Sequence, residues 1–231
     1  MAIFKQYFEP ESSTYTYLLA DSDTRQAVLI DTVDSQKDFY LAELERLGLD
    51  LQWILETHVH ADHITAAGQL RDATGATTAV GKACGAECAN VQLEDGQTLV
   101  FGNEVIRVIN TPGHTVGSVS YLWRDRVFTG DALLIGGCGR TDFQGGDAAQ
   151  LYHSIVDRLF VLPDETLVYP GHDYKGRTVS SIGEEKRTNP RLAGKTEAEF
   201  VEIMNNLNLA RPKKIDEAVP ANKVCGITHA A

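Results

Sequence analysis

The chain has 231 residues, of which 43% are hydrophobic and 23% charged, the proportions of a globular protein with a substantial core. The net charge of −11 argues against nucleic acid or an anionic membrane as a partner, because both bind basic surfaces. No apolar run is long enough to cross a bilayer, and the N-terminus lacks the layout of a secretory signal. We therefore expect a cytoplasmic bacterial protein, with an organelle matrix left open as the other compartment.

Short apolar segments and turn residues indicate that strands are followed by helices in each half of the chain. This order favours an α/β protein in which two sheets pack together with helices outside them. We expect a single domain over residues 1–231, with an extended tail from about 209 to 231. In chain order, the sequence predicts strands at 3–8, 14–20 and 26–31, a helix that Asp34 or Ser35 caps and Gly48 ends, a strand at 52–57, a helix at 62–73, strands at 77–81, 97–101, 104–110, 118–123 and 126–129, a helix at 147–159, a strand at 166–169, and helices at 177–187 and 196–208.

The cysteines contain no C-x-x-C pair, and a chain of this length does not depend on a disulfide framework. We expect reduced thiols in a reducing compartment. Cys138 lies in a glycine-rich loop, where a small buried side chain is the favoured interpretation. The four cysteines are Cys84, Cys88, Cys138 and Cys225.

Imidazole and carboxylate groups gather directly after the strand predicted at 52–57. His58 and His60 are two residues apart, so they share one face at the end of that strand. Asp62 and His63 follow where the chain turns back over it. Three of the seven histidines of the chain fall in this short run, which favours a metal site over a polar surface loop.

Three later segments have a similar design, in which a predicted strand leads into a glycine or Pro-Gly and then a possible ligand. They present His114, Asp131 and His172. Glycine lets the backbone turn sharply at a strand end and aim the next side chain inward. Together with the first run, these segments predict a metal centre at the mouth of the sheets. The residues leave open whether it holds one metal or two, because no ligand-type residue is missing.

The H-x-H-x-D-H run at 58–63, followed by His114, Asp131 and His172, resembles the metallo-β-lactamase superfamily over residues 14 to about 175. The stretches 57–66 and 130–146 are most similar to its persulfide dioxygenases. The segment Cys138–Gln144 and the short part after His172 differ from glyoxalase II, a near relative. The resemblance implies the αββα four-layer sandwich, and the oxidation of glutathione persulfide by O₂ and water to sulfite and glutathione.

The resemblance also implies one iron(II) per chain, held by His58, His114 and Asp131. Two histidines and one carboxylate leave three coordination positions open for O₂ and the outer sulfur of the substrate. Four further residues would surround this site and orient ligands and waters. They are His60, Asp62, His63 and His172.

Glutathione carries carboxylates, which arginine side chains bind well. Arg140 and Tyr174 match glutathione-contacting positions of the glyoxalase II relatives. Arg177 and Arg191 are further candidates by placement only.

Two other functions stay open at this point. The first is a glyoxalase II-type hydrolase of glutathione thioesters, which would use two metals and a bridging hydroxide. The second is a persulfide or metal sensor that keeps the site without catalysis. Metal content separates the two enzymes, since about one iron per chain supports the dioxygenase and two zinc ions the hydrolase. The sequence does not decide the oligomeric state, and a homodimer is compatible with it.

Overall fold

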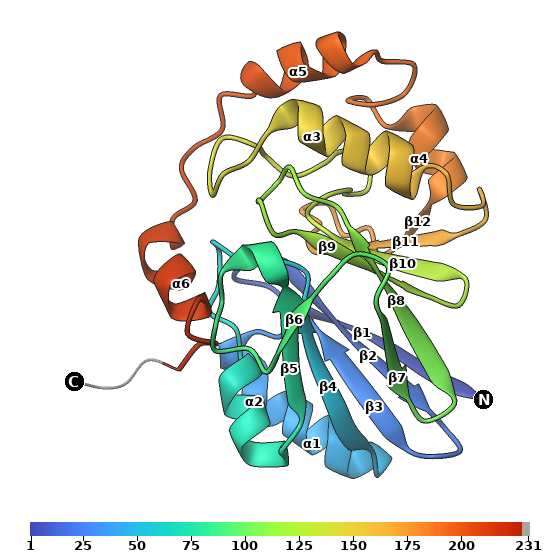
Figure 1. The fold of residues 1–231 in the computed structure, drawn as a ribbon, viewed down its shortest axis with the longest axis vertical. Coiled ribbons are helices and arrows are strands. Elements are labelled where there is room, and N and C mark those ends of the chain that lie inside the picture. The colour runs from blue at the N-terminus through green and yellow to red at the C-terminus, as the bar shows by residue number, and fades with distance from the viewer. Residues whose placement is uncertain (228–231) are drawn as a thin grey trace.

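Two six-stranded sheets pack face to face in the computed structural model, which describes residues 1–227 (Figure 1). One sheet holds β1 to β6 in sequence order, and the other runs from β12 to β7. Strands β3 to β6 are parallel to one another, as are β10 and β11. The strands are β1 Ala2–Glu9, β2 Thr14–Asp21, β3 Gln26–Ile30, β4 Asp50–Glu56, β5 Thr77–Gly81, β6 Val91–Leu93, β7 Thr98–Phe101, β8 Glu104–Asn110, β9 Val119–Trp123, β10 Arg126–Gly130, β11 Leu167–Pro170 and β12 Ser180–Ser181.

The alternation of side chains along the central strands explains the layers. In β2, Tyr17 and Leu19 belong to the core between the sheets, whereas Leu18 and Ala20 pack toward the helices on the other face. Both faces of this strand are therefore covered, and it is buried over its whole length. The second sheet follows the same rule, so a third core lies between it and its own helices. The predicted four-layer αββα sandwich is confirmed.

Helices α1 and α2 cover the first sheet, and α3, α4 and α5 lie over the second (Figure 1). Gly48 ends α1 in a left-handed conformation, as its position predicted. The helices are α1 Lys37–Leu47, α2 Ala67–Thr74, α3 Ala148–His153, continued by a π-helix at Ser154–Leu159, α4 Ile182–Thr188, α5 Glu197–Asn205 and α6 Ile215–Asn222, with short 3₁₀ turns at Asp34–Gln36 and Lys82–Cys84.

Two predicted helices begin later than expected. The helix predicted at 62–73 starts only at Ala67, so the H-x-H-x-D-H run lies in an irregular loop. The helix predicted at 177–187 is wrong over its first residues, because β12 pairs with β11 there. Ser181 then caps α4, since its side chain accepts a hydrogen bond from the backbone N–H of Glu184. Strand β6 was not predicted.

The C-terminal segment corrects two expectations. The predicted extended tail instead contains α6, and residues 228–231 lie outside the described residues. Reduced thiols were expected throughout, but Cys88 and Cys225 form a disulfide across 137 residues of sequence. This bond fastens the end of the chain to the loop before β6. Cys84 and Cys138 are free and buried, as expected for Cys138, and burial raises the pKa of the Cys138 thiol to about 11.

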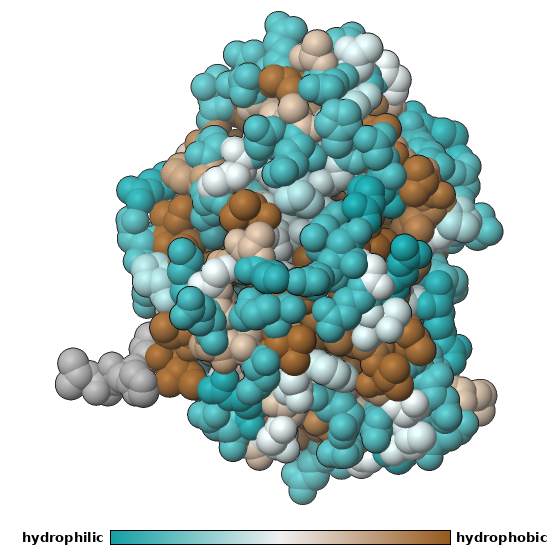
Figure 2. All heavy atoms as spheres, viewed as in Figure 1, coloured by the Kyte–Doolittle hydropathy of each residue, from teal (hydrophilic) through white to brown (hydrophobic). Residues whose placement is uncertain are grey.

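Hydrophilic residues predominate on the face seen in Figure 2, where hydrophobic residues form small groups. The exposed large hydrophobic side chains include Val161 and Tyr174, which belong to separate segments. Among the helices of residues 1–227, none combines the length and apolar character that a membrane span requires.

Candidate metal centre

The possible metal ligands come from segments that leave the ends of strands in both sheets. Thr57–His63 follows β4, His114 follows β8, Asp131 follows β10 and His172 follows β11. In the parallel pair β10–β11, Gly130 lies opposite Pro170, so Asp131 and His172 emerge side by side. The fold therefore brings together residues that are up to 114 positions apart.

His58, His114 and Asp131 form one group, in which a ligand atom from each lies within 4.8 Å of the others. Nε2 of His114 lies 3.7 Å from Oδ2 of Asp131. The rings of His58 and His114 are nearly perpendicular, with their centroids 4.9 Å apart. These three residues make the two-histidine, one-carboxylate set that suits iron(II).

A second group of three lies directly beside the first and consists of His60, Asp62 and His172. Nε2 of His172 lies 3.6 Å from Oδ2 of Asp62 and 3.6 Å from Oδ1 of Asp131. Asp131 thus stands between the two groups. His63 is held against Asp62, since its Nδ1 is 3.0 Å from Oδ2 of that residue.

Hydrogen bonds fix which ring nitrogen of each histidine is free to bind a metal. Nδ1 of His114 lies 2.7 Å from the carbonyl oxygen of Arg140, which can only accept, so Nδ1 carries the proton. Nδ1 of His172 donates in the same way to the carbonyl oxygen of Ser13 at 3.2 Å. In both rings Nε2 faces the carboxylates, and in the neutral ring it is the nitrogen that carries the lone pair. A metal-binding histidine needs this arrangement.

His58 is oriented by a relay of two other side chains. The Thr57 hydroxyl donates to Oδ2 of Asp31 at 2.8 Å, so its oxygen can accept from Nδ1 of His58 at 3.0 Å. Burial, followed by the neighbouring His60 and His114, lowers the pKa of His58 well below its ordinary value. His58 is therefore neutral at physiological pH, as a metal ligand must be.

Asp31 and Glu56 are buried partners of the site that the sequence analysis did not single out. Oδ1 of Asp31 accepts the Thr57 backbone N–H at 2.7 Å and lies 3.2 Å from Nε2 of His60, while Oε2 of Glu56 is 3.4 Å from the same nitrogen. Burial lowers the pKa of His60, but these two carboxylates outweigh it and raise that pKa well above its ordinary value. Asp31 directly follows β3, and β3 pairs with β4, the strand that leads to His58. An acidic residue at the end of a buried strand was the signal available in the sequence.

Unpartnered buried atoms show that the residues present fit a metal ion. Oδ1 of Asp131, Nε2 of His63 and Nδ1 of His60 are buried without a hydrogen-bond partner among the described residues. Such atoms cost free energy unless something satisfies them. A cation bound among these nitrogen and oxygen ligands would do so.

Glycines at two positions allow the close approach of backbone to this centre. Gly130 has a φ of 49°, and a Cβ atom there would lie 2.4 Å from the Thr57 hydroxyl oxygen. At Gly139 a Cβ atom would lie 2.8 Å from Nδ1 of His114. The glycine-rich stretch after β10 therefore packs directly against the rings that it positions.

Four residues were predicted to bind the substrate, and the structure places each of them in a different contact. The three arginines among them are already paired with protein groups. Arg140 forms a bidentate ion pair with Asp142, and Arg177 pairs with Asp173. Arg191 donates to the carbonyl oxygen of Cys138 at 2.6 Å. Tyr174 is 72% exposed and stacks on the ring of His172 with centroids 6.2 Å apart. Tyr174 and the backbone of Arg140 thus border the metal centre.

Comparison with known proteins places this centre in a family. Residues 10–172 match the sequence model of the metallo-beta-lactamase superfamily. The human mitochondrial persulfide dioxygenase ETHE1 is 49% identical over 230 residues, covering 97% of this chain and 89% of that protein. The chain belongs to the persulfide dioxygenase family of the metallo-β-lactamase superfamily.

Solved structures agree with this assignment. The crystal structure of ETHE1 from Myxococcus xanthus matches with a TM-score of 0.96 at 62% identity, and the match covers 97% of this chain and 100% of that one. The superfamily protein TTHA1623, solved in a di-iron-bound form, has a TM-score of 0.69 at 31% identity, with coverage of 81% and 100%. The family resemblance predicted from the sequence is confirmed, the chain is an enzyme of this family, and the glyoxalase II alternative is not favoured.

Proposed function

We propose that this chain is an iron-dependent persulfide dioxygenase, which converts glutathione persulfide, O₂ and water into glutathione, sulfite and two protons. One observation carries the choice of metal. His58, His114 and Asp131 lie together as two neutral nitrogens and one carboxylate, with no thiolate among them. This set favours iron(II) with open coordination positions over a closed zinc site.

The protein residues have separate tasks in this proposal. His58, His114 and Asp131 would hold the iron, which supplies the activation of O₂ when bound. Asp31, through Thr57, keeps His58 in the tautomer whose Nε2 faces the centre. His58, His60, His63 and His172 are buried, so the inner side of the site is shielded from bulk water and can orient the persulfide.

His60, Asp62, His63 and His172 would not bind the single iron in this proposal. They form a polar wall beside it, in which Asp62 lies against His63 and His172. Burial raises the pKa of Asp62, but the neighbouring His172 and His63 outweigh burial and lower it well below its ordinary value. Asp62 therefore stays ionised and can orient water near the centre.

Anaerobically purified, iron-reconstituted protein tests the proposal. Iron content, O₂ uptake and sulfite are measured with glutathione persulfide, and thioester hydrolysis with lactoylglutathione. We expect about one iron per chain, and O₂ uptake only when persulfide is present, because glutathione lacks the outer sulfur that receives oxygen. Efficient lactoylglutathione hydrolysis without persulfide-dependent O₂ uptake would replace the dioxygenase with a hydrolase.

Arg140 is proposed to bind a carboxylate of glutathione. The substrate carboxylate would replace the Asp142 carboxylate as the partner of the Arg140 guanidinium group. Its guanidinium group is planar and forked, which suits either partner. We expect Arg140→Ala to raise KM for glutathione persulfide roughly ten- to a hundredfold, because a charge-assisted hydrogen bond contributes about 1.5–3 kcal/mol. Steady-state O₂ uptake measures KM, and iron content should not change.

The matched control is Arg46→Ala, which breaks an arginine–carboxylate pair of the same kind with Glu43 on α1. Its KM should equal that of the original protein. If Arg140→Ala also leaves KM unchanged, carboxylate binding belongs to Arg177, Arg191 or a lysine instead.

A further inference from the structure

We propose that Asn222 is a positioning residue for the metal centre, which it reaches from the C-terminal helix α6. Its side chain binds the backbone of the loop Thr57–Ala66, here called the metal loop, at three points. The proposal rests on the function proposed above only in taking iron as the bound metal.

The amide group of Asn222 uses both of its donor hydrogens and its acceptor oxygen on the metal loop. Nδ2 donates to the carbonyl oxygens of His60 at 2.9 Å and His63 at 2.8 Å. Oδ1 accepts the backbone N–H of Thr65 at 2.8 Å. The side chain is only 6% exposed, so water does not compete for these bonds.

The metal loop needs such support because it has no regular secondary structure of its own. Between the end of β4 at Glu56 and the start of α2 at Ala67, the backbone forms neither a strand nor a helix. Its carbonyl groups at His60 and His63 both accept from the same side-chain amide of Asn222. Asn222 and His60 also line one small pocket behind the loop. Their hydrogen bonds therefore help to fix the direction in which the two imidazole rings project.

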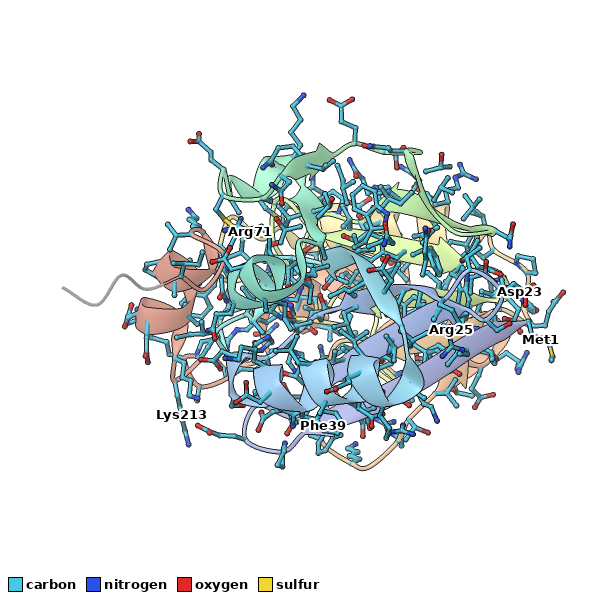
Figure 3. All side chains as sticks on the ribbon, turned by 90° about the horizontal axis from the view of Figure 1, so that it is seen from below. Met1, Asp23, Arg25, Phe39, Arg71 and Lys213 are labelled. Atoms are coloured by element: carbon cyan, nitrogen blue, oxygen red, sulfur yellow. A yellow bond between two sulfur atoms is a disulfide. The ribbon has the colours of Figure 1, made fainter. Side chains whose placement is uncertain are left out.

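Helix α6 is itself fastened to the body of the protein. The Cys88–Cys225 disulfide closes directly after α6, and the backbone N–H of Gly68 donates to the carbonyl oxygen of Cys225 at 2.9 Å. Nη1 of Arg71, on α2, donates to the carbonyl oxygen of Cys88 at 3.0 Å, and the disulfide is visible beside this arginine in Figure 3. Figure 1 shows α6 at the side of the molecule, next to α2 and β5. Asn222 thus extends from an anchored helix.

Asn222→Asp tests the proposal with little change of shape. Aspartate can still accept the Thr65 N–H, but it cannot donate to the two carbonyl oxygens and instead sets a negative oxygen against them. Asn222→Ala removes all three bonds. The rate of iron(II) release to a chelator is measured anaerobically, together with amide hydrogen exchange of residues 58–66 in the metal-free protein.

Asn222 holds the loop that carries the ligand His58 and does not bond a ligand directly, so we expect both variants to release iron about 10-fold faster, at the low end of the range found when a direct partner of a ligand is removed. Exchange of residues 58–66 should increase, while exchange of β8 and β9 stays as in the original protein. Asn103→Asp is the matched control. It sets a carboxylate against Asp21 at the β7–β8 hairpin, at the opposite end of β8 from His114, and should leave iron release unchanged.

Iron release at the original rate in Asn222→Asp would overturn the proposal, whatever the activity of the sample. If the Asn222 variants do not fold, Cys88→Ser provides the second test, because it frees α6 while keeping Asn222. Faster iron release and faster exchange of residues 58–66 in Cys88→Ser support the proposal, and unchanged values of both overturn it. Neither readout uses persulfide, so a failure of the proposed reaction would show only in the O₂ uptake assay.

Discussion

Replacing His114 with alanine is expected to empty the iron site and abolish persulfide-dependent O₂ uptake. His114 contributes one of only three ligands in the proposed set, and its Nε2 faces Asp131 at 3.7 Å. Removing an outer partner of a ligand already costs roughly 10- to 100-fold in metal affinity, so removing the ligand itself should cost more than that. Iron content after anaerobic reconstitution and desalting measures the effect. His58→Ala and Asp131→Ala should behave in the same way.

His60→Ala is the comparison that makes this prediction specific. In the proposed single-iron site His60 is not a ligand, so this variant should keep appreciable iron after the same treatment. It also removes the imidazole between Asp31 and Glu56, so its thermal stability is measured separately. If His60→Ala loses iron as completely as His58→Ala while remaining folded, the assignment of the three ligands is wrong.

Replacing Asp31 with alanine is expected to lower the free energy of unfolding of the metal-free protein by about 3–5 kcal/mol, as found when one partner of a buried ion pair is removed. The Asp31 carboxylate is buried, accepts two hydrogen bonds from Thr57 and lies against His60. Its backbone has a φ of 54°, a left-handed conformation that aspartate tolerates better than alanine. Urea denaturation of the chelator-treated protein measures the change.

Asp31→Asn separates the charge from the conformation. Asparagine also tolerates the left-handed backbone and keeps an acceptor for Thr57, so it should lose less stability than alanine does. Both variants should bind iron less well than the original protein, since the relay to His58 is disturbed. Equal stability of Asp31→Ala and the original protein would show that the buried contacts of Asp31 contribute little to the fold.

The sequence by itself determined the layers of the fold and the positions of the possible ligands. The apolar run in β2 and the left-handed glycine after α1 are local features, and they depend on nearest neighbours in the chain. His58, His114, Asp131 and His172 could be found in the same way, because each follows a strand and a sharp turn. The parallel pairing of β10 with β11 brings Asp131 and His172 together, and the packing of the two sheets brings His58 to the same place.

Only the tertiary structure decided the contacts made between distant segments. The Cys88–Cys225 disulfide spans 137 residues, and Asn222 meets His60 across 162 positions, so no local pattern marks either contact. The late start of α2 has the same origin, because the backbone N–H groups of Thr65 and Ala66 donate to Asn222 and to the Thr32 carbonyl oxygen instead of to helix partners. Arg191 likewise donates to the carbonyl oxygen of Cys138, which is 53 positions away in the chain. Spacing along the chain predicts which groups can reach a site, whereas their partners depend on how the whole chain packs.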